Sequence, residues 1–264
     1  MLDLKSISKT FNAGTVNEKT ALNNLCLHLN DGDFVTVIGG NGAGKSTMLN
    51  AVAGAWPVDE GTIEIGGVNV TKLPEYKRAK YLGRVFQDPM TGTAASMQIE
   101  ENMALAARRG LSRTLKKGIS SKEREFYRER LEELGLGLED RMTSKVGLLS
   151  GGQRQALTLL MATLKKPQLL LLDEHTAALD PKTAAKVLEA TDRIVGQDNL
   201  TTLMITHNMK DAIAHGNRLV MMYEGHIIYD VAGEEKKKLH VSDLLEKFEQ
   251  ASGGSFANDR MILS

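Results

Sequence analysis

The chain has 264 residues, of which 42% are hydrophobic, and its 33 basic residues balance its 33 acidic residues. This length is enough for one large domain or two lobes with a well-buried core, and a net charge of zero gives no reason to expect a nucleic-acid partner. The sequence contains a single cysteine, Cys26, and no apolar run of the roughly 18 residues that a membrane span needs. We therefore expect a cytoplasmic protein in which Cys26 is a core residue.

Short β-type runs dominate residues 1–87. The strands expected there are 33–38, 62–65 and 82–86. The first of these runs leads into a glycine-rich loop, which is followed by a helical pattern over residues 46–52.

The glycine-rich loop, residues 39–47, reads GGNGAGKST and matches the pattern G-x-x-x-x-G-K-[ST] at every fixed position. Glycines let the backbone turn its N–H groups toward an anion, and the following helix adds its positive end. Lys45 is expected to reach the β and γ phosphates of ATP, and the Ser46 hydroxyl is expected to bind Mg²⁺. The other residues expected to cradle the nucleotide are Gly39, Asn41, Gly42, Ala43, Gly44 and Thr47.

Helical patterns replace the strands between residues 88 and 166. Residues 99–109 are rich in Ala, Glu and Met, and Tyr127 and Leu131 recur at helical spacing within a charged segment. We expect an inserted helical lobe whose charged face is simply solvated.

Strand and helix patterns alternate in the remainder of the chain, which predicts an α/β protein with a largely parallel sheet covered on both faces. The expected strands are 168–173, 200–205, 218–223 and 226–230, and the expected helices are 181–195, 209–214 and 241–248. Residues 236–238 are three lysines, which we expect in a solvated turn, and residues 251–255 are expected to be a frayed tail.

Two carboxylates, Asp173 and Glu174, follow the buried run at 168–172. Open α/β sheets bind their ligands at this carboxyl edge of the strands. Asp173 is expected to orient Mg²⁺, while Glu174 positions and polarises the water that attacks the γ phosphate.

Residues 149–153, LSGGQ, combine a capping box from Ser150 to Gln153 with two glycines at a positive helix end. With the motifs above, this segment resembles the signature of the ATP-binding cassette (ABC) family, and the resemblance covers residues 1–229 in the family's motif order. It implies that Ser150, Gly151, Gly152 and Gln153 bind ATP held by a second copy of the chain, in a head-to-tail dimer that encloses two ATP molecules.

The resemblance also implies a fold, a P-loop NTPase core with a RecA-like, mostly parallel sheet, an antiparallel β subdomain and an inserted helical subdomain. The ATP-binding core is expected over 1–90 and 166–235, the helical subdomain over 91–165, and a C-terminal helix and tail over 236–264.

Further residues match family positions one at a time. Gln87 resembles the glutamine that senses Mg²⁺ and the γ phosphate, and His207 resembles the switch histidine that contacts the γ phosphate. Asp180 resembles the aspartate that crosses the dimer and is also expected to be a helix N-cap. Phe11 occupies the position of the aromatic residue that stacks on adenine, the alternative being a core aromatic. His175 departs from the family, which typically has Pro there, and its effect is open.

The chain has one cassette and no attached membrane domain, and residues 173–183 resemble cassettes that work with bacterial amino-acid-type binding proteins. Together these features favour the ATPase subunit of a bacterial importer for a small solute such as an amino acid. This reading implies integral membrane permease subunits, an extracytoplasmic solute-binding protein, and a location at the cytoplasmic face of the membrane. The alternatives are a soluble ABC-type assembly ATPase, such as the scaffold of iron–sulfur cluster biogenesis, and a regulatory nucleotide-binding subunit.

Overall fold

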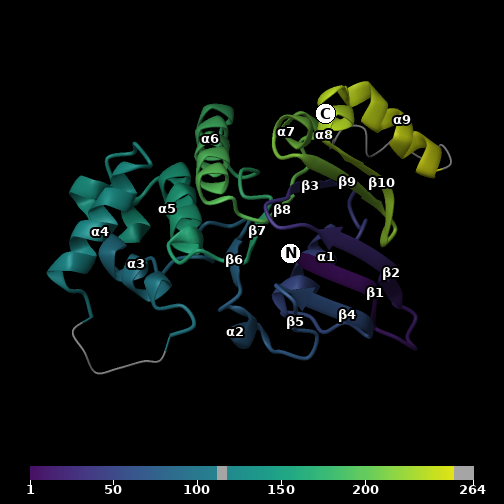
Figure 1. The fold of residues 1–264 in the computed structure, drawn as a ribbon, viewed down its shortest axis with the longest axis horizontal. Coiled ribbons are helices and arrows are strands. Elements are labelled where there is room, and N and C mark those ends of the chain that lie inside the picture. Colours follow the sequence, from purple (N-terminus) through teal and green to yellow (C-terminus); the bar gives the residue numbers. More distant parts are fainter. Residues whose placement is uncertain (112–117, 253–264) are drawn as a thin grey trace.

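The computed structural model describes residues 1–111 and 118–252, and its strands form two sheets. The strands are β1 (Leu2–Phe11), β2 (Lys19–Leu29), β3 (Phe34–Ile38), β4 (Glu60–Ile65), β5 (Val68–Asn69), β6 (Leu82–Val85), β7 (Leu169–Asp173), β8 (Thr202–Ile205), β9 (Arg218–Tyr223) and β10 (His226–Ala232). One sheet has the order β2-β1-β4-β5 and is antiparallel, and the other has the order β10-β9-β3-β8-β7-β6 (Figure 1).

In the larger sheet the strands from β9 to β6 are parallel to one another. Among the described strands of this sheet, only the edge strand β10 is antiparallel, to its neighbour β9. Every residue of β3 and of β8 is buried, as expected for strands covered on both faces. The α/β prediction, with a P-loop NTPase core and an antiparallel subdomain, is confirmed.

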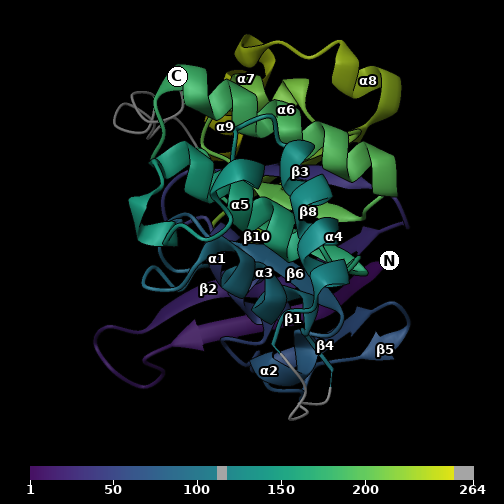
Figure 2. The same cartoon turned by 90° about the vertical axis from the view of Figure 1, so that its left-hand side faces the viewer.

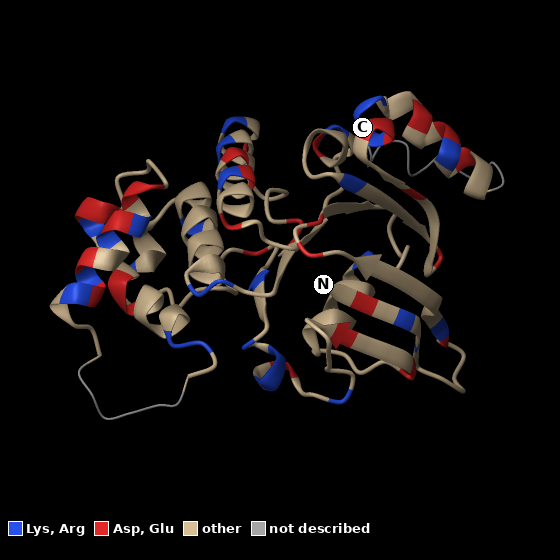
Figure 3. Cartoon of the chain, viewed as in Figure 1, with Lys and Arg blue, Asp and Glu red and all other residues tan. Residues whose placement is uncertain are grey.

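The helices lie around the two sheets (Figure 1). They are α1 (Lys45–Ala53), α2 (Glu75–Arg78), α3 (Ile99–Ala107), α4 (Ser121–Glu132), α5 (Gly151–Thr163), α6 (Pro181–Asp198), α7 (Met209–Ala214), α8 (Gly233–Lys237) and α9 (Val241–Ser252), with 3-10 turns at Glu139–Arg141 and Val146–Leu148. Helices α3, α4 and α5 gather at one side of the molecule, away from the antiparallel sheet (Figures 1 and 2). Charged side chains alternate along α4, most of whose residues are exposed, as expected (Figure 3).

The core divides into layers on the two faces of the large sheet. Leu169 and Leu171 of β7 pack with α1 and the antiparallel sheet, whereas Leu170 and Leu172 pack with the helices of residues 99–195. Because side chains alternate across a strand, one leucine run serves both layers.

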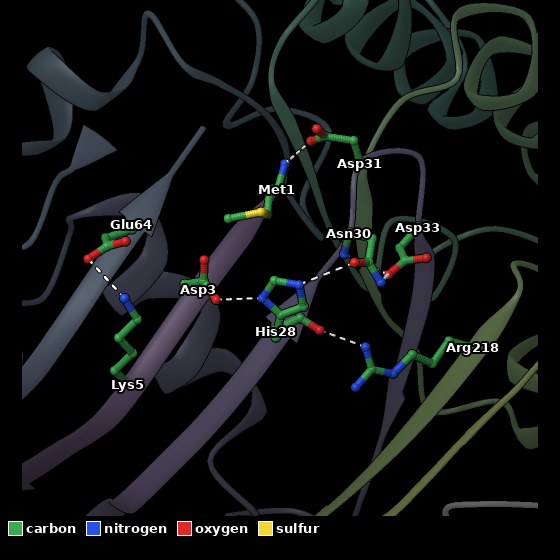
Figure 4. Close-up of polar contacts among 9 residues, drawn as sticks. All are labelled: Met1, Asp3, Lys5, His28, Asn30, Asp31, Asp33, Glu64 and Arg218. Atoms are coloured by element: carbon green, nitrogen blue, oxygen red, sulfur yellow. Dashed lines mark hydrogen bonds and ion pairs between the residues drawn. The ribbon is translucent and has the colours of Figure 1, made fainter. Parts of the chain in front are cut away.

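Polar contacts join the two sheets where β2 turns toward β3 (Figure 4). The amino group of Met1 pairs with Asp31, and His28 Nδ1 lies 2.5 Å from Asp3 Oδ1. Arg218 at the start of β9 donates to the His28 carbonyl at 2.6 Å. The first strand of the small sheet is thereby tied to the large sheet.

Two expectations are wrong. Cys26 is exposed, because the alternation in β2 turns Leu25 and Leu27 inward and leaves Cys26 outward. Lys236 lies in α8 rather than in a solvated turn and is 2% exposed, and its ammonium group donates to the backbone carbonyls of His215 and Gly216.

The expected tail at 251–255 begins within α9, and residues 253–255 lie outside the described part of the chain. None of the helices within 1–111 and 118–252 is long and apolar enough to cross a bilayer.

Candidate functional site

The glycine-rich loop connects β3 to α1 in a conformation that requires glycine. Gly44 caps α1 with a φ of 99°, and a side chain there would place its Cβ 2.5 Å from the Ala21 carbonyl oxygen. Gly39 has a φ of 156°, and its Cβ would lie 2.4 Å from the Met222 carbonyl oxygen. The loop is therefore wedged between β2 and β9, and only glycine fits these two positions without displacing backbone.

Lys45, the first residue of α1, bends back over this loop. Its ammonium nitrogen donates to the carbonyls of Gly39 at 2.7 Å and Gly40 at 3.1 Å, and the side chain is 5% exposed. A buried cation beside a positive helix end is suited to a polyphosphate.

A cavity of about 310 Å³ opens in front of the loop. Its lining residues are Phe11, Lys19, Ala21, Asn41, Gly42, Ala43, Gly44, Lys45, Ser46, Thr47, Glu174 and His207. The structure thus brings together most of the nucleotide-binding residues expected in one chain, with Glu174 and His207 among them.

Asp173 and Glu174 lie at the carboxyl end of β7. Burial raises the pKa of Asp173, an effect that Arg84 opposes and Glu174 reinforces; the Arg84 guanidinium is 3.6 Å from the Asp173 carboxylate. Glu174 has a φ of 46°, a left-handed value that is uncommon for a residue with a side chain.

The Glu174 carboxylate meets His207, which follows the neighbouring strand β8. His207 Nε2 lies 2.5 Å from Glu174 Oε1, while the Glu174 side chain is 9% exposed. A carboxylate held in this way beside a phosphate cradle has the position that a water-orienting group needs.

Residues 150–153 begin α5 at a different place. Ser150 Oγ accepts from the Gln153 N–H at 3.3 Å, and the Gln153 side chain accepts from the Ser150 N–H at 3.2 Å, which completes the expected capping box. Ser150, Gly152 and Gln153 line a separate cavity of about 340 Å³ between α5 and α6. Within the described residues, they do not share the Lys45 cavity.

Asp180 and Gln87 also lie outside the lining of the Lys45 cavity. Asp180 is the N-cap of α6 and accepts from the Thr183 N–H at 3.1 Å. Hydrogen bonding to the Thr183 side chain, and secondly to its backbone N–H, lowers the pKa of Asp180. Gln87 is exposed, two residues after β6.

Phe11 ends β1 at the rim of the cavity, where its ring packs edge-on against Trp56 with a centroid distance of 5.1 Å. The ring is half-buried rather than enclosed in the core.

Three residues near the site were not given a role from the sequence. Lys19 at the start of β2 lines the cavity, and Arg84 on β6 faces Asp173 and donates to the Asn50 side chain at 2.8 Å. His175 is fully enclosed, and burial, with a smaller contribution from His215, lowers its pKa to about 4. The strand expected at 82–86 contains Arg84, whereas Lys19 lies outside the expected strands, and the sequence pattern does not indicate which strands lie beside the glycine loop.

Comparisons with known proteins agree with this geometry. Residues 22–177 match the family model described as ABC transporter. The tyrosine transport ATP-binding protein of Clostridioides difficile (strain R20291) is 46% identical, over 95% of this chain and 100% of that protein. The methionine import ATP-binding protein MetN of Bartonella henselae is 36% identical, over 86% of this chain and 64% of that protein.

Solved structures are similar as well. A dimeric post-hydrolysis state of the ATP-binding cassette MJ0796, bound to ADP and Pi, superposes with a TM-score of 0.75. The two chains are 28% identical, and the superposition covers 88% of this chain and 98% of the solved chain.

Proposed function

The chain belongs to the ABC transporter family as an ATP-hydrolysing subunit that drives transport, and from this premise we propose that it powers the import of an amino acid. One observation carries the choice of solute, the 46% identity over 100% of a tyrosine transport ATP-binding protein. The similarity to a methionine import protein points to the same solute class.

Within one chain, we assign ATP to the cavity lined by Phe11 and the glycine loop. Phe11 stacks on the adenine ring, and the loop N–H groups and Lys45 bind the phosphates. Glu174 orients and deprotonates the attacking water, and His207 contacts the γ phosphate and holds the Glu174 carboxylate.

Ser46 and Asp173 are the proposed Mg²⁺ residues, with Gln87 approaching the metal and the γ phosphate. Hydroxyl and carboxylate oxygens suit Mg²⁺, and within the described residues no cluster of three His, Cys, Asp or Glu side chains forms a complete metal cage. This sparse donor set fits an ion that keeps its waters and shares phosphate oxygens. Bound Mg²⁺ would neutralise charge that develops on the phosphates.

The second half of each ATP site comes from another copy of the chain in this proposal. Ser150, Gly151, Gly152 and Gln153 form a positive helix end that does not face the Lys45 cavity of its own chain, and Asp180 lies at the start of α6 beside it. A head-to-tail dimer brings both features to the partner's ATP. ATP binding then closes the dimer, and hydrolysis reopens it.

The dimer acts on integral membrane permease subunits at the cytoplasmic face of the membrane, supplied by an extracytoplasmic solute-binding protein. Residues 1–90 and 166–235 are the proposed ATP-binding core, 91–165 the helical subdomain that meets the permease, and 236–264 the C-terminal segment. The similarity to transport proteins favours this assignment over an assembly ATPase or a regulatory subunit.

Reconstitution tests the proposal. The chain would be co-purified with its permease, placed in proteoliposomes with the solute-binding protein, and assayed for ATP-dependent uptake of radiolabelled tyrosine and of methionine. We expect uptake that Lys45→Ala abolishes. ATP hydrolysis without uptake of either amino acid would overturn the choice of solute and leave the ATPase assignment intact.

A further inference from the structure

The loop that carries Glu174 is anchored by the residue after it. His175 is 2% exposed, and its Nε2 lies 3.1 Å from the hydroxyl oxygen of Thr191, which is itself fully buried in α6. A polar side chain in such a place needs a hydrogen-bond partner, and this contact joins the loop after β7 to α6.

The direction of this hydrogen bond follows from the other contact of Thr191. The Thr191 hydroxyl donates its one proton to the Val187 carbonyl at 2.8 Å. Its oxygen is left to accept, so His175 donates from Nε2–H to Thr191. The imidazole is thereby held in one orientation and one tautomer.

Glu174 needs such an anchor because its backbone is strained. A left-handed φ of 46° in a residue with a side chain persists only where the surroundings determine it. Two backbone hydrogen bonds hold Glu174: its N–H donates to the Ile205 carbonyl at 3.0 Å, and its carbonyl accepts from the Ala177 N–H at 3.0 Å. The His175 ring adds a side-chain anchor immediately after the strained residue.

The same stretch of α6 also holds the element that follows His207. Asp192, next to Thr191, lies 2.7 Å from His215 Nδ1 at the end of α7. Two consecutive residues of α6 thus hold the Glu174 loop and α7, and Glu174 and His207 meet between them.

We infer that His175 is a positioning residue for hydrolysis: its hydrogen bond to Thr191 fixes the loop in which the left-handed Glu174 directs its carboxylate toward His207 and the phosphate cradle. Without this bond the loop relaxes toward ordinary backbone conformations, and the carboxylate spends less time in the position from which it orients the attacking water. The inference rests on the proposed role of Glu174 in hydrolysis.

Four single substitutions test it on the full chain. His175→Phe keeps a ring and removes the donor, and Thr191→Val keeps the shape and removes the acceptor. His175→Gln places an amide N–H near the position of Nε2, whereas the matched control His175→Asn places it near Nδ1. The measurements are kcat for ATP hydrolysis with Mg²⁺, the Kd for ATP with Mg²⁺ chelated, and the urea midpoint of unfolding.

The expected result separates the chemical step from nucleotide binding. His175→Phe, His175→Asn and Thr191→Val lower kcat by about 5- to 10-fold, the effect of one neutral hydrogen bond, with the Kd for ATP changed by less than about 2-fold. His175→Gln keeps kcat within about 2-fold of the native value. The double variant His175→Phe/Thr191→Val is no slower than either single variant, because both remove one bond.

Equal kcat values for His175→Gln and His175→Asn, or multiplied losses in the double variant, would overturn the inference. If His175→Phe did not fold, the Gln and Asn pair and Thr191→Val would still decide. A Glu174→Gln variant run beside them separates the two claims. Full activity of Glu174→Gln refutes the proposed function, whereas its loss together with a fully active Thr191→Val refutes the positioning role alone.

Discussion

The two glycines at the start of α5 differ in the space around them, which gives a matched pair of substitutions. A Cβ on Gly151 would meet Leu179 at 3.4 Å, an ordinary contact, whereas a Cβ on Gly152 would lie 2.0 Å from the Thr183 methyl group. Gly151 is exposed and Gly152 is buried against α6. One glycine therefore leaves room for alanine within the chain and the other does not.

Gly151→Ala should leave the isolated chain intact and still impair hydrolysis. Replacing glycine in the first turn of a helix raises the free energy of unfolding by about 0.5–1 kcal/mol where the conformation is compatible. The added methyl group lies where the proposed dimer brings the partner's ATP, so we expect a loss of hydrolysis of at least about 10-fold at unchanged ATP affinity.

Gly152→Ala should instead destabilise the chain by about 1–3 kcal/mol, because Thr183 must move. Thr183→Ser removes the clashing methyl group and should restore most of that stability in the double variant, since the Asp180 cap uses the backbone N–H of residue 183. Urea unfolding and steady-state hydrolysis measure both effects. Native hydrolysis by Gly151→Ala would refute the reasoning that a nucleotide approaches this helix end.

Three further outcomes follow from other contacts. Burial lowers the pKa of Lys236 to about 8, so the folded chain binds fewer protons than the unfolded chain between pH 8 and 10.5. The contribution of Lys236 to the free energy of unfolding therefore rises with pH by about 3 kcal/mol over that window. Urea titrations should show this rise in the native chain and not in Lys236→Met. Arg78 is 2% exposed and donates to carbonyls that include those of Ala51 and Val52 at the end of α1. Arg78→Met should therefore lower the free energy of unfolding, measured in urea, by about 3 kcal/mol. A decrease of less than about 1 kcal/mol would contradict this. Phe11→Ala should weaken ATP binding about 3- to 10-fold by fluorescence titration, while Phe11→Tyr should keep it within about 2-fold.

Local patterns predicted most of the fold, because strand burial and helix capping depend on residues that are close together in the sequence. The run at 168–173 and the cap at Asp180 led directly to β7 and to the start of α6. The expected strand at 200–205 starts later, at Thr202, because Asn199 ends α6 in a left-handed conformation and Leu200 closes that turn.

Features that depend on distant segments could not be predicted. Nothing near Lys236 in the sequence indicates that the carbonyls at the end of α7 accept from it. The position of Arg84 beside Asp173 depends on the pairing of β6 with β7, which residues 86–168 separate along the chain. The contact of His175 with Thr191 depends on how α6 packs. Cys26 is a different kind of error, since the alternation of β2 contained the answer.

The most direct test of the central claim is steady-state ATP hydrolysis with Mg²⁺ at increasing protein concentration, for the native chain and for Glu174→Gln, with size-exclusion chromatography of the variant plus ATP. A site shared between two copies predicts a rate per chain that rises with concentration, and a variant that hydrolyses little and elutes as a dimer with ATP. A monomeric native chain that hydrolyses ATP at a rate independent of concentration would contradict the shared site.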